Sequence, residues 1–304
     1  MRGLSGLLLK QRPADSATIV FLLCLDLLTI IFYPAVPRAP FLIGLYSILI
    51  FVQAVLIGSK DRGSFAGILR AILFPIICVL LIFDSLGQLV HYISPSDIDP
   101  LLIRIDYTIF HNHPTVLLEK IMHPLLTDIL HAAYACYYFI PITFCIILFK
   151  RGMKKEFDRS VFLILFCFYL SYLGYILFPA LGPRFYLNDI QTTGLNGLFI
   201  TEHVQRILNQ LEGIKRDAFP SGHTAITVLV LWLAYRYNKR YFRIALPVVA
   251  ALIFATVYCR YHYVIDVIAG FALTFVTLVV GERYYAWWER RQPGFKSGGK
   301  RKAL

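Results

Sequence analysis

Charged residues are scarce in this chain of 304 residues. Asp, Glu, Lys and Arg together make up 16% of it, 58% is apolar, and the mean hydropathy is +0.65. A soluble domain usually has about 25% charged and about 45–50% apolar residues. The shortage of charge therefore excludes an ordinary soluble domain and predicts an all-α integral membrane protein that crosses the bilayer several times.

Features that mark several other protein classes are missing too. The chain has six cysteines but no CxxC pair, which argues against a thiol metal site and favours small packing residues. It shows no polar linker and no internal repeat. Inverted repeats and paired broken helices are typical of transporters, so a transporter or a non-enzymatic scaffold is the less favoured interpretation.

Long apolar stretches dominate the rest of the sequence. A helix needs about 20 apolar residues to cross a bilayer. We expect about eight transmembrane helices, at residues 17–36, 40–57, 66–91, 122–149, 160–180, 223–237, 243–260 and 263–285. Residues 1–91 would form N-terminal transmembrane helices, residues 122–289 a transmembrane core, and residues 290–304 a basic, disordered tail.

The segment between the third and fourth stretches, residues 92–121, is too polar to span a bilayer. Ser94-Pro95-Ser96-Asp97 is a typical helix start. Apolar residues follow at helical spacing, at Ile98, Leu101, Leu102, Ile105 and Ile109. This pattern predicts an amphipathic helix that lies in the membrane interface.

The net charge of +12 would suit a nucleic-acid partner, but its distribution indicates a membrane instead. With eight spans and both termini on one side, most of the 30 Lys and Arg residues fall on the side of the termini. Basic residues concentrate on the cytoplasmic side of membrane proteins. We therefore expect no nucleic-acid partner, cytoplasmic termini, and span ends near residues 184, 222 and 262 that face the periplasm or a lumen.

Two histidines stand at span ends on that predicted face. His262 and Asp266 are four residues apart at the start of the last span, so they share one face of a helix. A carboxylate beside an imidazole fixes its tautomer and stabilises the cation that forms when the ring attacks a substrate. A hydrogen bond that serves packing alone would also explain the pair.

The other histidine, His223, opens the sixth stretch directly after Pro220-Ser221-Gly222. Glycine lets a ligand approach the backbone closely, and successive N–H groups at a helix start form an anion site. The Ser221 hydroxyl can donate one more hydrogen bond. Taken alone, the pattern is also that of an ordinary helix start.

Arginines accompany both motifs. Arg260 lies two residues before His262, and Arg184 lies at the outer end of the fifth stretch. A guanidinium matches phosphate oxygens, although a single arginine at a span end more commonly just reaches toward the lipid headgroups. Groups suited to phosphate recur at three span ends on one predicted face, which favours a phosphoryl-transfer site there.

In their order and placement, these residues resemble the three signature motifs of the type 2 phosphatidic acid phosphatase superfamily. The resemblance covers about residues 120–285 and implies a six-helix catalytic bundle. It implies that His262 is the nucleophile that becomes a phosphohistidine, that Asp266 orients it, and that His223 protonates the leaving alcohol and then deprotonates the acceptor. The phosphate would be bound by Arg184, Arg260, Ser221 and the Gly222 backbone, and neither a metal nor another cofactor is implied.

The chain departs from the family's pattern at two positions. Leu177 stands where a lysine normally precedes the first-motif arginine, and Thr256 stands where the third-motif arginine normally lies. Arg260 follows Thr256 by one helical turn, and Lys215 or Arg216 is a candidate to replace the lysine. Because a phosphomonoester dianion needs more cationic charge than a diester, the two losses favour a diester substrate.

The run 261–266 and the tyrosine-rich stretch 131–141 are similar to inositol phosphorylceramide synthases and sphingomyelin synthases. Those enzymes move a phospho-headgroup from a glycerophospholipid to another lipid alcohol. The resemblance therefore implies a lipid phosphotransferase that works in a membrane on a phospholipid and a lipid alcohol. The alternative is a lipid phosphate phosphatase, of the phosphatidic acid or isoprenoid phosphate type, that uses water as acceptor and the same residues.

Overall fold

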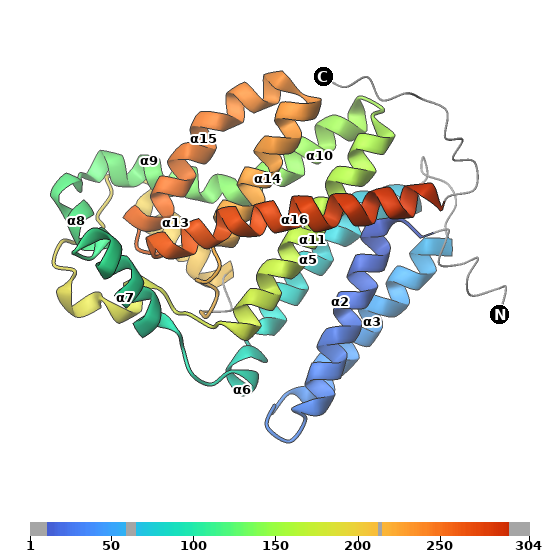
Figure 1. The fold of residues 1–304 in the computed structure, drawn as a ribbon, viewed down its shortest axis with the longest axis horizontal. Coiled ribbons are helices and arrows are strands. Elements are labelled where there is room, and N and C mark those ends of the chain that lie inside the picture. The colour runs from blue at the N-terminus through green and yellow to red at the C-terminus, as the bar shows by residue number, and fades with distance from the viewer. Residues whose placement is uncertain (1–10, 59–64, 212–214, 292–304) are drawn as a thin grey trace.

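The computed structural model describes residues 11–58, 65–211 and 215–291, and all regular structure in these residues is helical (Figure 1). The first two helices, α2 (Pro13–Ile31) and α3 (Ala39–Gly58), form a hairpin at one edge of the molecule. The third span consists of α4 (Phe65–Ile68), the π-helical turn η1 (Leu69–Leu73) and α5 (Phe74–Leu86).

A run of short helices follows at one end of the bundle. It contains α6 (Val90–Ile93), α7 (Asp99–Phe110), α8 (Pro114–Leu117) and the 3-10 turn η2 (Leu118–Ile121). The main helix of this run, α7, begins two residues after Asp97, the last residue of the predicted helix start. It buries Asp99, Leu102 and Asp106, whereas Leu101 and Ile109 are 54% and 51% exposed. Since apolar side chains are stable against lipid, the inward face is free to carry carboxylates.

The remaining helices form the core. The fourth apolar stretch is broken into α9 (Pro124–Ala135), the turn η3 (Cys136–Tyr138) and α10 (Ile140–Lys150), with a bend of 48°. Next come α11 (Lys154–Leu177), α12 (Pro183–Tyr186), η4 (Asn188–Ile190), α13 (Thr201–Leu211), α14 (Gly222–Tyr237), α15 (Lys239–Tyr258) and α16 (Val264–Arg290). The central helix is α11, because 72% of its most apolar 18-residue segment is buried, against 28–39% for the other spans.

The predicted number of eight spans is not confirmed. In the described part of the chain, six helices are long and apolar enough to cross a bilayer, and the bent pair α9–α10 raises the number to seven. The expected span at 223–237 is α14, whose 16 residues measure about 24 Å. This is shorter than the hydrocarbon core of about 30 Å, and α14 packs among α10, α11, α15 and α16. The all-α, multi-pass architecture is confirmed, but eight spans are not.

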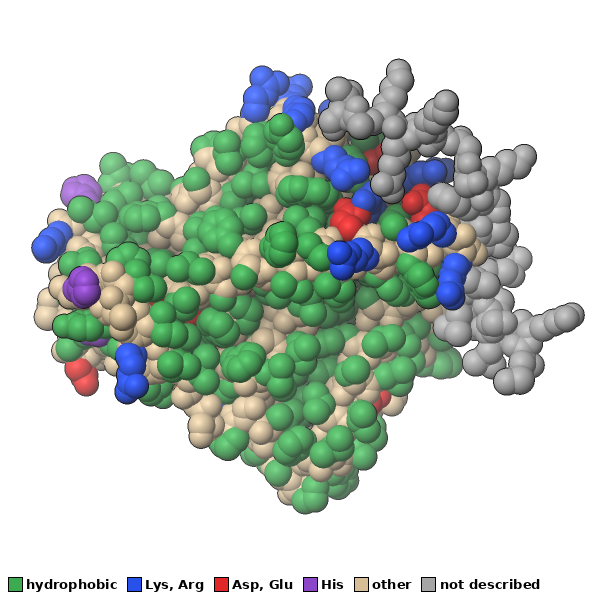
Figure 2. All heavy atoms as spheres, viewed as in Figure 1, with side chains coloured by type: hydrophobic (Ala, Val, Ile, Leu, Met, Phe, Trp, Pro, Cys, Tyr) green, Lys and Arg blue, Asp and Glu red, His purple; other side chains and the backbone are tan. Residues whose placement is uncertain are grey.

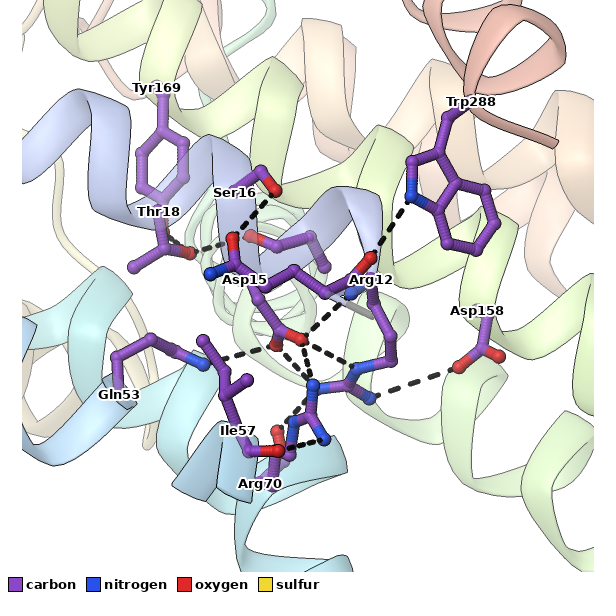
Figure 3. A network of polar contacts seen from close by, with 12 residues as sticks. Arg12, Asp15, Ser16, Thr18, Gln53, Ile57, Arg70, Asp158, Tyr169 and Trp288 are labelled. Atoms are coloured by element: carbon purple, nitrogen blue, oxygen red, sulfur yellow. Dashed lines mark hydrogen bonds and ion pairs between the residues drawn. The ribbon is translucent and has the colours of Figure 1, made fainter. Parts of the chain in front are cut away.

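A buried ionic network joins α2 to its neighbours near the start of α11 (Figure 3). Arg12 donates to Asp15 Oδ1 at 2.8 Å and lies 3.8 Å from Asp158 Oδ1 of α11. Arg70 of η1 also pairs with Asp15, and Gln53 of α3 donates to the same carboxylate at 3.1 Å. Charges are stable in such apolar surroundings only when they are paired, so the network fixes the positions of α2, α3, η1 and α11.

The face of the molecule shown in Figure 2 is mostly apolar, as expected for a protein embedded in lipid. Lys and Arg side chains gather mainly toward the end where α16 finishes, and the visible histidines lie at the opposite end, around α8 and α9. This asymmetry is compatible with the predicted orientation, in which the basic end is cytoplasmic. The predicted tail lies outside the described residues from residue 292 onward.

Candidate active site

The three motifs meet at the end of the bundle where α11 finishes. The Ser221 N–H donates to the carbonyl of Asp266 at 3.0 Å, which joins the start of α14 to the start of α16. The Arg184 N–H donates to the carbonyl of Arg260 at 3.0 Å, which joins α12 to the turn after α15. Residues distant in the sequence are thus held side by side by backbone hydrogen bonds.

The two histidines face each other at this junction. His262 Nε2 and His223 Nδ1 are 3.5 Å apart, and both rings are buried. His262 lies in the turn between α15 and α16, where its N–H donates to the carbonyl of Thr256 at 2.9 Å. The rings are close enough for a single phosphate group to contact both.

The ring of His262 is held through its Nδ1 atom. Nδ1 lies 2.7 Å from the carbonyl oxygen of Ala218. A carbonyl can only accept, so the proton resides on Nδ1 and the lone pair on Nε2. Asp266 Oδ2 is more distant from Nδ1, at 3.5 Å, and accepts the N–H of Tyr263 at 2.8 Å. The closest acceptor is therefore a backbone carbonyl, which no side-chain motif reveals.

The protonation state of His262 follows from its burial. Loss of water around the imidazolium lowers the pKa of His262 to about 4; Asp217 and the Ala218 carbonyl oppose this shift and Arg184 adds to it. At neutral pH the ring is therefore uncharged, with a lone pair on Nε2. This is the form that a nitrogen nucleophile requires.

Tyrosines from the 131–141 stretch enclose His223. The ring centroids of Tyr134 and Tyr137 lie 4.4 Å and 4.1 Å from that of His223. Among the described residues, the Nε2 atom of His223 is buried without a hydrogen-bond partner. Buried polar atoms are nearly always satisfied, so this nitrogen is a good candidate to contact a substrate.

The first residues of α14 form a tight helix start. Ser221 is completely buried, and its Oγ accepts the N–H of Thr224 at 3.3 Å. A Cβ atom at Gly222 would lie 2.4 Å from the hydroxyl of Tyr175, so a side chain here would have to displace that hydroxyl. The partial positive charge at a helix start favours an anion beside His223.

The predicted phosphate-binding arginines are placed differently from each other. The guanidinium carbon of Arg184 lies 4.9 Å from the ring centroid of Tyr261, and its charge acts on His262. Arg260 lies beyond the end of α15, with a left-handed backbone (φ 64°), rather than one helical turn along the face of Thr256. Its guanidinium pairs with Glu119 of η2 at 2.7 Å.

Arg216 and Lys215, the two candidates to replace the missing lysine, also lie in different surroundings. Arg216 Nε binds Asp97 Oδ1 at 2.8 Å, and Arg216 Nη1 lies 2.6 Å from His91 Nδ1. This guanidinium therefore fastens the segment before α14 to the short helices at the end of the bundle. Lys215 is exposed.

Asp99, in the first turn of α7, was not singled out from the sequence. Its carboxylate accepts the N–H groups of Leu181 and Gly182 at 2.9 Å and 2.8 Å and the hydroxyl of Tyr263 at 2.9 Å. Gly182 has a φ of 90°, and a Cβ there would lie 2.6 Å from the carbonyl oxygen of Tyr261. Asp99 thus holds together the loops that carry Arg184 and His262.

Asp106, two helical turns later, has a similar position. Its two oxygens accept the N–H groups of Val264 and Ile265 at 2.8 Å and 2.9 Å, and so cap the start of α16. The seven-residue spacing from Asp99 puts both carboxylates on one face of α7. Two acidic residues on one face of a mostly apolar helix were the available signal.

A third carboxylate, Asp217, lies beside the histidines. It is half-buried, and it lines a cavity together with His223. Burial raises the pKa of Asp217, while the positive charge of Arg184 and the neighbouring His262 oppose the rise. In the described part of the chain, no three His, Cys, Asp or Glu side chains gather as metal ligands would.

Comparison with known proteins agrees with this geometry. A phosphoinositol dihydroceramide synthase from Bacteroides thetaiotaomicron is 31% identical over 150 residues, which is 45% of this chain and 49% of that protein. A PA-phosphatase related-family protein from Dictyostelium discoideum is 30% identical over 113 residues, which is 36% of this chain and 20% of that protein. The chain thus spans about half or less of the length of these relatives. No solved structure matches it.

The family model of the PAP2 superfamily matches residues 101–280, which include most of α7, both histidine motifs and most of α16. The matched region contains every residue that was expected to act on phosphate. This chain belongs to the PAP2 superfamily.

Proposed function

We propose that this chain is a membrane lipid phosphotransferase that moves a phospho-headgroup from a glycerophospholipid to a lipid alcohol through a phosphohistidine. The observation that carries the proposal is the facing pair His262 and His223, with 3.5 Å between Nε2 and Nδ1 and with the His262 proton held on Nδ1 by Ala218. The relative named as a phosphoinositol dihydroceramide synthase supports headgroup transfer as the reaction type.

In the first half-reaction, the lone pair of His262 Nε2 attacks phosphorus. A P–N bond forms while the P–O bond to the diacylglycerol oxygen breaks, and His223 gives its proton to that oxygen. The negative charge of the phosphate stabilises the protonated form of His223 before the transfer. Asp266, 3.5 Å from Nδ1, stabilises the positive charge that develops on the His262 ring.

In the second half-reaction, the acceptor alcohol takes the place of diacylglycerol. His223 removes the hydroxyl proton, the alcohol oxygen attacks phosphorus, and the P–N bond breaks to restore His262. Phosphate oxygens lie beside Arg184 and the start of α14, where the guanidinium and the helix N–H groups balance the negative charge of the transition state.

The balance of charge favours a phosphodiester over a phosphomonoester donor. Arg260 is paired with Glu119, and Arg216 is paired with Asp97. Asp217 lies close enough to Arg184 to interact with its charge. Such a site has little net positive charge to offer the dianion of a monoester, but it suits the single charge of a diester.

A lipid phosphate phosphatase is the second candidate, since a relative carries the name PA-phosphatase related. The first half-reaction would be the same, and water in place of the lipid alcohol would release free phosphate. The proposal predicts no metal requirement in either case, so dialysis against EDTA should leave the activity unchanged. A loss of activity on dialysis that added Mg²⁺ reverses would contradict the proposal.

A purified, reconstituted sample distinguishes the two reactions. Vesicles containing phosphatidylinositol and ceramide should yield a ceramide that carries the headgroup, whereas vesicles containing phosphatidic acid should yield little free phosphate. His262→Ala should lower the rate by several powers of ten, as removal of a member of a catalytic unit does. His203→Ala, at an exposed histidine of α13, is the matched control and should keep wild-type activity.

Free phosphate alone, with no new headgroup-bearing lipid, would favour the phosphatase. Undiminished activity in both His262→Ala and Asp266→Ala would reject the mechanism. We also propose that the site faces the periplasm or a lumen. Cysteines introduced at 150–154 and 236–240 should then resist an impermeant thiol reagent in intact cells, and their labelling would reverse the assigned orientation.

A further inference from the structure

A cavity of about 230 Å³ runs between α5, α10 and α11 and reaches the candidate active site. Its wall is almost entirely apolar. Asp217 and His223 are the acidic and imidazole side chains among its lining residues in the described part of the chain, and both lie at the end that carries the histidine pair. The cavity is thus polar at the reacting end and hydrocarbon-like elsewhere.

The cavity is nearly as long as the hydrocarbon core of a bilayer is thick. Its lining extends along α11 from Phe157 to Tyr175, a separation of about 27 Å at 1.5 Å per residue. The hydrocarbon core of a bilayer is about 30 Å thick. The lining therefore follows α11 from the histidines across most of the depth of the membrane.

The far end of the cavity lies at the level of the buried ionic network. Ala71 and Phe157 line that end, and each directly neighbours a charged member of the network, Arg70 and Asp158 respectively. Figure 3 shows Arg12, Asp15 and Arg70 packed against one another below the start of α2. A hydrocarbon chain cannot displace these paired charges without leaving them unsolvated.

The side of the cavity reaches the lipid-facing surface. Leu80 of α5 lines the cavity and is also 53% exposed. In a membrane protein, an exposed leucine on a spanning helix lies against lipid. At Leu80, the wall of the cavity therefore borders the bilayer directly.

We propose that this cavity holds one acyl chain of the diacylglycerol moiety of the donor, and that the Arg12–Asp15–Arg70 network limits the length of that chain. The inference rests on the proposed function, in which the diacylglycerol oxygen leaves at His223. That oxygen and its chain must lie on the His223 side of the phosphate, and His223 is the histidine that lines the cavity. A hydrocarbon chain matches the lining, whereas a soluble phosphate ester has no group to place against it.

Photochemical cross-linking tests where the chain lies. The probe is a diacylglycerol with a diazirine at the methyl end of one 16-carbon chain, incorporated in phosphatidylcholine vesicles with the wild-type protein. Cross-links should map to η1 and the first turns of α11, around Ala71 and Val161. A diazirine near the glycerol should mark η3, around Tyr137. Cross-links spread evenly over the outer faces of α2 and α3 would overturn the inference.

Chain-length preference is the second measurement. Val161 is 7% exposed and lines the far half of the cavity, whereas Leu173 of the same helix is 40% exposed. Val161→Trp should lower kcat/KM for donors with long chains relative to short ones by about tenfold or more, since an overfilled pocket rejects extra methylenes. Leu173→Trp, the matched control, should leave the ratio unchanged. An equal change of the ratio in both variants would count against a limit on chain length at the far end of the cavity.

The two hypotheses fail in different ways. The cross-linking pattern should persist in His262→Ala, because binding of the chain does not need the nucleophile. The expected pattern in a protein without phosphotransfer activity would support the cavity assignment and refute the proposed reaction. Full activity with cross-links elsewhere would refute the cavity assignment alone.

Discussion

The most informative substitution is Asp99→Asn, because this side chain binds two loops of the candidate site and no expected reacting atom. Asn has nearly the same shape as Asp but one acceptor oxygen instead of two. Its amide group would face either the N–H of Leu181 or the donors on the other oxygen, Gly182 N–H and the Tyr263 hydroxyl. At least one buried donor therefore loses its acceptor.

A buried donor without a partner costs about 1–3 kcal/mol. If that cost appears fully in the transition state, kcat/KM for headgroup transfer should fall about 5- to 150-fold, since each 1.4 kcal/mol corresponds to a factor of ten. The loss should lie mainly in kcat, because the loops that carry Arg184 and His262 would be displaced relative to each other. The assay is transfer from phosphatidylinositol to ceramide in vesicles.

The matched control is Asp189→Asn, the same change at an exposed aspartate of η4. It should keep wild-type kinetics. Thermal unfolding in detergent separates positioning from gross destabilisation, since Asp99→Asn should remain folded at the assay temperature. Wild-type kcat in Asp99→Asn, or an equal loss in both variants, would refute the assignment of Asp99 as a positioning residue.

Three further predictions follow from the charges. Asp217→Asn removes the negative charge beside Arg184, so the ratio of phosphatidic acid hydrolysis to headgroup transfer should rise by about tenfold in paired assays, and an unchanged ratio would contradict it. His262 must be uncharged to attack, and its pKa is lowered to about 4. On the acid side, kcat/KM should therefore fall only as the pH drops through about 4. A fall centred near pH 6.5 would exclude His262 as the group that titrates. Asp15→Ala leaves Arg12 and Arg70 without their shared carboxylate and should destabilise the protein by about 3–5 kcal/mol in thermal unfolding. An unchanged stability would mean that the network does not stabilise the fold.

The motif residues could be predicted from the sequence because their chemistry is local. His262 and Asp266 share one helical turn, and Ser221, Gly222 and His223 are consecutive. The structure brings these segments together, with 3.5 Å between the two imidazoles. The membrane helices were predictable for a similar reason, since a long apolar run has few alternatives in a bilayer.

Other features depend on tertiary contacts and have no local signature. The length of the span predicted at 223–237 is one of them, because α14 has only 16 residues and packs among other helices. The Ala218 carbonyl that holds His262 belongs to the backbone, so residue identity says nothing about it. The pairing of Arg260 with Glu119 depends on a left-handed turn after α15.

The segment at 92–121 shows most clearly what the sequence leaves out. It has four acidic residues, and each binds a different part of the motif loops: Asp97 binds Arg216, Asp99 the loop before Arg184, Asp106 the start of α16, and Glu119 binds Arg260. Bonds to charged groups are strong where water is excluded. An interfacial segment that looks like a passive surface helix therefore sets the distances between motifs. Two of these carboxylates, Asp97 and Asp99, precede the region that the family model matches. We infer that the geometry of the phosphate site depends on residues outside that region, and that the carboxylates reduce its positive charge while they build it.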